Sequence, residues 1–221
     1  MNRLALFDCD GTLVDSGATI HRALALTFAE AGLAVPEARQ SRRVIGLSLT
    51  EAMAALLPGL GAADHHALAQ SYKLQFTALR GAGEVEEPLF EGIIELLDTL
   101  EQDGWLLGVA TGKSDRGLKH CLDLHGIHAR FVSLQTGDRH PSKPHPSMAL
   151  LAMAEAGASP ETTFVVGDTS FDMAMAAAAG ALPVGAGWGY HDADDLMRAG
   201  AAGVADAPGD VLALIAEHVH G

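Results

Sequence analysis

The sequence predicts an α/β protein with a parallel, doubly wound sheet that is interrupted by a helical insert. Residues 4–7 form a short apolar run near the N-terminus, and Gly11 breaks it, which is typical of a buried parallel strand. From Glu91 onward, helical patterns alternate with short apolar strands, as in parallel sheets covered by helices. Residues 17–84 carry helical patterns and no strand pattern.

The elements are expected in the following order. Ser16 can cap a helix that runs to about Ala31, and further helices are expected near 37–43, 49–57 and 64–79, where glycines and prolines separate them. A Gly- and acid-rich linker, residues 81–88, precedes the alternating part. In that part, helices are expected over 91–102 and 170–179, and two further helices are expected to begin at 114 and 146. Strands are expected over 105–110, 131–134, 163–166 and 182–185. We therefore expect a core of residues 1–16 and 85–221 and an insert of residues 17–84 that is hinged like a lid.

Composition limits the compartment and the partners. The chain has 221 residues, of which 48% are hydrophobic and 19% charged, so a sizeable core is expected. The net charge of -14 disfavours nucleic acid as a partner. Cys9 and Cys121 form no paired motif, which fits a reducing, cytoplasmic compartment. Residues 173–190 lack charge, but Pro183 and several glycines interrupt them, so a helix, a turn and a strand are expected rather than a membrane span.

Polar side chains stand at the carboxyl ends of the expected strands or in the loops beside them, and parallel strands bring these ends to one edge of the sheet. The candidates are Asp8, Asp10, Thr111, Lys143, Asp168 and Asp172. Two unpaired acids buried side by side cost several kcal/mol, so a divalent cation is expected among them. Carboxylate and carbonyl oxygens are hard ligands that suit Mg²⁺.

The residue types indicate a division of roles at this edge. Asp8 can bind the metal and attack an electrophile. Two such close acids would push each other's pKa apart, and because Asp8 is committed to the metal, Asp10 is the better candidate for the general acid. A carboxylate that approaches a phosphate dianion meets a repulsion of about 4 kcal/mol at contact distance. Mg²⁺ and Lys143 would offset this repulsion, while Thr111 and helix N-termini would hold the non-reacting oxygens.

Together these motifs resemble those of the haloacid dehalogenase-like hydrolase superfamily, and within it the phosphoglycolate phosphatase-like branch. The four signatures match Asp8-Cys9-Asp10-Gly11-Thr12-Leu13-Val14-Asp15-Ser16, Thr111-Gly112, Lys143-Pro144, and Gly167-Asp168 with Asp172. Trp188-Gly189-Tyr190 and the helical insert also look like this branch. The resemblance covers essentially the whole chain, and four motifs in this order are highly specific.

The resemblance implies a Rossmann-like core and an α-helical cap that closes over the substrate. It implies a Mg²⁺-dependent phosphatase of small phosphomonoesters that works through a phosphorylated Asp8, with Asp10 as general acid and then base. The metal would be held by Asp8, the Asp10 carbonyl and Asp168, while Asp172 would orient Lys143 or a metal-bound water. The partner would be a small phosphorylated metabolite, with phosphoglycolate as the leading candidate, and the protein would be a monomer or a homodimer.

Substrate contacts are expected from both parts of the chain. Thr111 and Gly112 would bind the phosphate, and Arg43 and Gly46, in Arg42-Arg43-Val44-Ile45-Gly46-Leu47-Ser48 of the insert, would reach the substrate, because this stretch faces the active site in similar phosphatases. Lys113, by contrast, is expected in solvent.

Other functions stay open at this stage. A haloacid dehalogenase lacks the second acid, so Asp10 argues against that activity. A phosphosugar mutase tends to carry Glu-Asp in the fourth motif, where this chain has Gly167-Asp168. A catalytically idle relative could bind a phosphorylated ligand as a regulator, although the intact acids argue against it.

Overall fold

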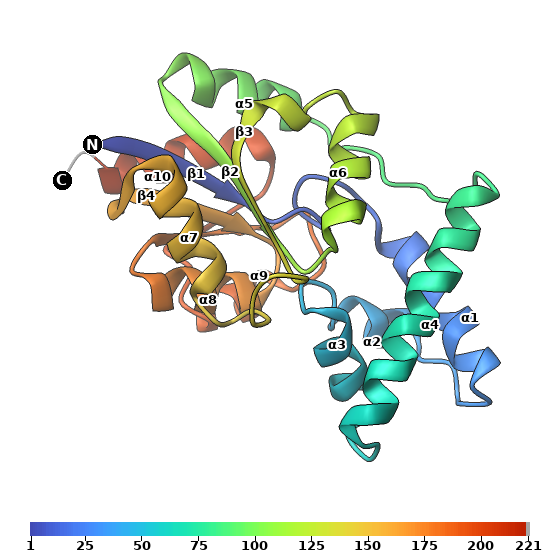
Figure 1. The fold of residues 1–221 in the computed structure, drawn as a ribbon. Coiled ribbons are helices and arrows are strands. Elements are labelled where there is room, and N and C mark those ends of the chain that lie inside the picture. The colour runs from blue at the N-terminus through green and yellow to red at the C-terminus, as the bar shows by residue number, and fades with distance from the viewer. Residues whose placement is uncertain (220–221) are drawn as a thin grey trace.

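The computed structural model describes residues 1–219, and its centre is a six-stranded parallel sheet (Figure 1). The strands are β1 (Asn2–Phe7), β2 (Trp105–Thr111), β3 (Phe131–Thr136), β4 (Ala158–Gly167), β5 (Leu182–Ala186) and β6 (Gly203–Ala205), in the spatial order β3-β2-β1-β4-β5-β6. The predicted α/β fold with a doubly wound parallel sheet is confirmed. Residues 220–221, the last two of the expected core, lie outside the described residues.

Helices cover both faces of the sheet because the central strand is apolar on both sides. Ala5 and Phe7 pack on one face, against α5 (Ile93–Gln102), α6 (Asp115–Leu124) and α10 (Val211–Val219). Leu4 and Leu6 point to the other face, against α7 (Ser147–Ala156) and α8 (Ser170–Ala179). A further helix, α9 (Ala193–Arg198), packs on α8 and the last two strands, and short 3-10 turns lie at His128–Arg130 and Pro208–Asp210.

Residues 17–84 form four helices that lie together beyond one end of the sheet (Figure 1). They are α1 (Gly17–Glu30), α2 (Ala38–Arg42), α3 (Leu49–Leu56) and α4 (Ala62–Gly81). These helices share an apolar cluster that is separate from the clusters on the sheet and includes Phe28, Met53, Leu68 and Tyr72. The cluster supports our proposal that residues 17–84 are a cap domain, called the cap below, on a core of residues 1–16 and 85–221.

The two connections between core and cap run side by side. The Asp15 N–H donates to the Pro88 carbonyl over 2.8 Å, and the Phe90 N–H donates to the Leu13 carbonyl over 3.0 Å. Because both crossing segments are held by the same short ladder, they enter and leave the core at one point. A pivot at this place is the geometry that a hinged lid requires.

The uncharged stretch of residues 173–190 has the expected form. It contains most of α8, a turn at Gly180 and then β5. No helix within residues 1–219 is both long and apolar enough to cross a lipid bilayer. The sequence patterns did not indicate α9, β6 or α10, because these elements are short or follow Gly- and Ala-rich segments with weak periodicity.

The aromatic contacts at the centre of the sheet provide a test of the core. Phe164 is 1% exposed, and its ring meets Trp105 at 4.7 Å and Phe7 at 6.5 Å between centroids. Phe164→Ala should lower the free energy of unfolding by about 3–5 kcal/mol, since it removes a ring and leaves a cavity. Chemical denaturation measures this loss. Leu150→Ala, at a position that is 48% exposed on α7, is the control and should change stability by less than about 1 kcal/mol.

Candidate active site

Two acids meet where the strand order reverses. Asp8 follows β1 and Asp168 follows β4, and the two strands are neighbours. The Asp8 N–H extends the ladder by donating to the Val166 carbonyl over 2.9 Å. Ligands of open α/β sheets bind in the crevice at such a reversal, outside the carboxyl ends of the strands. Both carboxylates are at most 1% exposed.

Lys143 is a fully buried cation between two carboxylates. Its Nζ lies 2.9 Å from Asp8 Oδ1 and 2.6 Å from Asp172 Oδ1. Asp172 is itself held by Thr169, whose N–H and hydroxyl donate to Oδ2 over 3.1 and 2.6 Å in the capping box of α8. Burial alone would lower the pKa of Lys143, but Asp172 and Asp8 outweigh burial and raise it. Lys143 is therefore a cation at neutral pH, and Asp172 fixes its position.

The carboxylates at this edge carry more negative charge than Lys143 can neutralise. Asp8, Asp168 and Asp172 each offer an oxygen within 4.8 Å of the others. Burial raises the pKa of Asp8 to about 7, with Lys143 opposing and Asp172 adding to the effect. Burial, Asp8 and Asp172 also raise the pKa of Asp168 well above its ordinary value. Such shifts show that the ionised forms lack sufficient compensation from the protein alone.

The donor set fits a divalent cation. Within the described part of the chain, Oδ2 of Asp8 is buried and has no hydrogen-bond partner. Asp168 is held in place by Thr12, whose hydroxyl donates to Oδ1 over 3.0 Å, and by the Tyr190 N–H, which donates to Oδ2 over 2.9 Å. Carboxylate oxygens that are oriented but undercompensated are suitable ligands for a hard cation.

The side chain of Asp10 lies in a different environment from that of Asp8. Lys113 Nζ lies 2.8 Å from Asp10 Oδ1, and the Ser16 hydroxyl donates to the same oxygen. Ser16 was expected to cap α1, but its side chain makes no capping hydrogen bond. The prediction that Lys113 is solvated is wrong, because its side chain is only 9% exposed. Because Lys113 lies just beyond the carboxyl end of β2, it is close to the acids at this edge of the sheet and forms an ion pair with Asp10.

Glu87 extends this contact toward the cap. Lys113 Nζ lies 2.6 Å from Glu87 Oε1, and Arg80, near the end of α4, lies 3.2 Å from Glu87 Oε2. Burial would raise the pKa of Glu87, but Lys113 and Arg80 outweigh it and lower the pKa. An unbroken series of ion pairs thus joins Asp10 in the core to Arg80 in the cap. Sequence reasoning missed Glu87 because an acid in a polar linker is usually solvated. For Lys113, a signal was available: it directly follows Thr111-Gly112, which places it at the edge of the sheet where the acids lie.

The expected phosphate loop touches the cap. Thr111 is 1% exposed, and its hydroxyl accepts the Lys113 N–H over 3.3 Å. A Cβ at Gly112 would overlap the carbonyl oxygens of Gly46 and Leu47, so only glycine permits this approach. Gly46 has a φ of +95°, and a Cβ there would lie 3.1 Å from the Thr169 hydroxyl. The structure thus brings Gly46 and Gly112 together at the boundary between cap and core.

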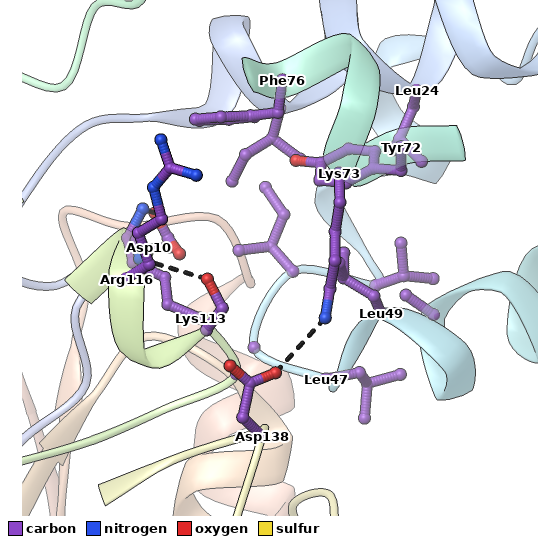
Figure 2. A pocket seen from close by; sticks show the side chains of 18 of the residues that line it. Asp10, Leu24, Leu47, Leu49, Tyr72, Lys73, Phe76, Lys113, Arg116 and Asp138 are labelled. Carbon is purple, nitrogen blue, oxygen red and sulfur yellow. Dashed lines mark hydrogen bonds and ion pairs between the residues drawn. The ribbon is translucent and has the colours of Figure 1, made fainter. Parts of the chain in front are cut away.

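Arg43 approaches the core through its main chain, which lies beside His191. The Arg43 side chain is exposed, and it does not line the cavity that lies between cap and core. This cavity, called the cap cavity below, has a volume of about 330 Å³ and reaches Asp10, Gly112 and Lys113 (Figure 2). The cap is held against the core beside it, because the Ser48 N–H donates to the Ser142 hydroxyl over 2.8 Å.

The Trp188-Gly189-Tyr190 segment supports the loop after β1. Trp188 Nε1 donates to the Thr12 carbonyl over 3.0 Å. The Tyr190 hydroxyl accepts the Ser16 N–H and donates to Asp15, each over 3.0 Å. This segment therefore fixes both the loop that bears Asp8 and Asp10 and, through the Tyr190 main chain, the Asp168 carboxylate.

The raised pKa of Asp8 predicts a pH-dependent response to Mg²⁺. Its folded pKa of about 7 lies above the ordinary 3.8, so the metal-free protein carries a full stability penalty above pH 7, and this penalty shrinks as the pH falls from about 7 toward 3.8. A cation must compete with this proton. Mg²⁺ should therefore raise the melting temperature more at about pH 8 than at about pH 5.5. Asp8→Asn should remove this difference in scanning calorimetry; an equal Mg²⁺ response at both pH values in the unmodified protein would contradict the assignment.

Comparison with known proteins agrees with the site. A family model of haloacid dehalogenase-like hydrolases matches residues 5–186. The chain is 36% identical over 203 residues to "Probable phosphatase IndB" of Dickeya dadantii, covering 90% of this chain and 87% of that protein. It is 33% identical over 194 residues to the phosphoglycolate phosphatase of Xanthomonas campestris, covering 87% and 86%. A haloacid dehalogenase-like family hydrolase from Streptococcus pneumoniae has a similar structure, with a TM-score of 0.83, 29% identity and coverage of 97% and 98%. Its sequence and its fold together place the chain in the haloacid dehalogenase-like hydrolase family, in the phosphoglycolate phosphatase-like branch that its motifs predict.

Proposed function

We propose that the protein is a Mg²⁺-dependent phosphatase of small phosphomonoesters and that it works through an aspartyl-phosphate on Asp8. The observation that carries the proposal is the Asp8 carboxylate itself. It is buried at the end of β1, lies 2.9 Å from Lys143, and keeps one oxygen without a hydrogen-bond partner among the described residues. Relatives that carry the name phosphatase support the same reaction class.

The first half-reaction transfers the phosphoryl group to the protein. A carboxylate oxygen of Asp8 attacks phosphorus, and the bond from phosphorus to the ester oxygen breaks. Lys143 lowers the repulsion between the carboxylate and the phosphate, and Thr111 with the N–H groups at the start of nearby helices holds the non-reacting oxygens. Mg²⁺, when bound by Asp8, the Asp10 carbonyl and Asp168, supplies further positive charge.

Asp10 moves the protons in both half-reactions. It donates a proton to the departing alkoxide, and it then accepts a proton from the water that attacks the phosphorylated Asp8. Inorganic phosphate leaves, and the Asp8 carboxylate is restored. Ser16 and Lys113 bind the Asp10 side chain, whereas Lys143 binds Asp8, so the nucleophile and the proton carrier have different partners.

The contact at Gly167 supports hydrolysis over a mutase. A Cβ at position 167 would overlap the Asp172 side chain, which is in turn bonded to Lys143. A glutamate there would displace Asp172 and with it the cation beside the nucleophile. The Asp172–Lys143 pair therefore requires a glycine before Asp168.

Substitution of the two acids tests the proposal. Asp8→Asn should abolish Mg²⁺-dependent release of phosphate from an aryl phosphate, because the amide is no nucleophile. Asp10→Asn should lower kcat by about 10²–10⁴-fold, the usual range for a general acid. Asp10→Asn should retain the Mg²⁺-induced rise in melting temperature, since its contact to the metal is through the main chain.

Asp206→Asn, at an exposed carboxylate after β6, is the matched control and should keep the activity of the unmodified protein. If Asp10→Asn loses the response to Mg²⁺ but keeps its rate, the roles of the two acids are reversed. Tight binding of phosphorylated ligands without turnover, at any pH or metal, would favour the idle regulator instead.

A further inference from the structure

The cap cavity has an apolar wall that the reaction at Asp8 does not require. Most of its cap residues are hydrophobic, and they include Ile20, Leu24, Val44, Leu49, Tyr72 and Phe76. Figure 2 shows Leu24, Tyr72 and Phe76 grouped on one side of the cavity, with Leu47 and Leu49 also lining it. The rings of Tyr72 and Phe76 are 5.9 Å apart between centroids. The volume of about 330 Å³ lies within the range of pockets for organic ligands.

The position of the cavity makes it the place for the alcohol of the ester. It reaches Asp10, which would protonate the departing oxygen, and Gly112 of the expected phosphate loop. An ester whose phosphate lies at Asp8 would therefore extend its alcohol past Asp10 and between the cap helices. A short acid such as glycolate would leave most of this space unfilled.

Three of the four lysines and arginines that line the cavity already pair with acids. Lys113 pairs with Asp10 and Glu87, and Lys73 pairs with Asp138 over 3.3 Å. Arg80 pairs with Glu87, and among the described residues its buried Nε has no hydrogen-bond partner. A substrate carboxylate placed against the apolar wall would lose its hydration without gaining a cation that is free of an acidic partner, which is unfavourable. Of the cations that line the cavity, Arg116 is the one without an ion pair among the described residues, and it is exposed to solvent.

Tyr72 adds one polar group to the wall. Burial, and secondarily the charge of Asp10, raises the pKa of its hydroxyl, so the group stays protonated at neutral pH. No hydrogen bond joins this hydroxyl to another residue of the described chain. The wall therefore offers two aromatic rings and one donor, which suits a flat or bulky ring better than a short acid. The Arg80 guanidinium lies over one face of Phe76, 5.1 Å from the ring centroid.

We infer that the substrate is not phosphoglycolate but a phosphomonoester whose alcohol is mainly apolar and contains a ring. This inference rests on the proposed phosphatase function. The core residues that act on the phosphate are then shared with the family, whereas α1, α3 and α4 select the alcohol through the cap cavity.

Three esters separate these possibilities: 2-phenylethyl phosphate, ethyl phosphate and phosphoglycolate, each with Mg²⁺. The first two leave as similar primary alcohols and differ in the ring. We expect kcat/KM for 2-phenylethyl phosphate to exceed that for either of the others by about tenfold or more, the scale of discrimination by an apolar pocket.

Variants of the apolar wall show whether the cap cavity causes the preference for 2-phenylethyl phosphate. Phe76→Ala removes one ring, and Ala52→Leu, in the cavity-lining part of α3, fills space. Each should lower the ratio of kcat/KM for 2-phenylethyl over ethyl phosphate by about tenfold. Leu74→Ala, at a 71% exposed position of α4, is the control and should keep the ratio. Because Ala52→Leu adds atoms rather than removing them, it keeps the test informative if Phe76→Ala is unstable.

The outcomes distinguish this inference from the proposed function. If phosphoglycolate is the best ester, and Arg116→Gln removes that preference while Phe76→Ala and Ala52→Leu leave the ratio unchanged, the inference is overturned and the phosphatase stands. If none of the three esters releases phosphate with Mg²⁺, the proposed function itself fails, and the inference fails with it.

Discussion

The buried pairing of Lys143 with Asp8 and Asp172 is the interaction on which the rest of the site depends. Several ionisable groups lie at one edge of the sheet with almost no access to water, and such burial is tolerated only when charges compensate each other. Lys143 neutralises part of the negative charge, and the remainder suits the cation that we propose at this edge. The same charge balance that lets the core fold would therefore also prepare Asp8 for its proposed role as nucleophile.

The topology explains why these groups can share a site. Asp8 and Asp168 follow adjacent strands, and Asp172 lies one helical turn beyond Asp168, so short local segments deliver three acids to one place. Lys143 comes from a separate loop after β3 and is positioned by Asp172. Rigid strand ends and a capped helix thus orient the reacting groups, which reduces the cost of ordering them during the reaction.

A second set of ion pairs connects Asp10, the proposed proton carrier, to the cap. Asp10, Lys113, Glu87 and Arg80 form a continuous series from the core, through the linker, to the end of α4. These pairs lie next to the point where both connections cross between core and cap. A displacement of α4 would therefore alter the environment of the proton carrier as well as the shape of the cap cavity. In the proposed mechanism, the cap would therefore act on both the chemistry and substrate selection through one set of contacts.

Local pattern was sufficient for the strands through β5, most helices and the residues at the strand ends, because periodicity and the parallel-edge rule are properties of short segments. The buried states of Lys113 and Glu87 could not be read in this way, since each depends on a partner far away in the chain. The cap cavity has the same origin: Tyr72 and Phe76 read as ordinary apolar positions of a helix, and only the packing of α4 over the core makes them a wall. The sequence alone thus determined which groups could do chemistry and at which edge of the sheet they lie. Long-range packing decided which ion pairs these groups form and how much space is left for a substrate.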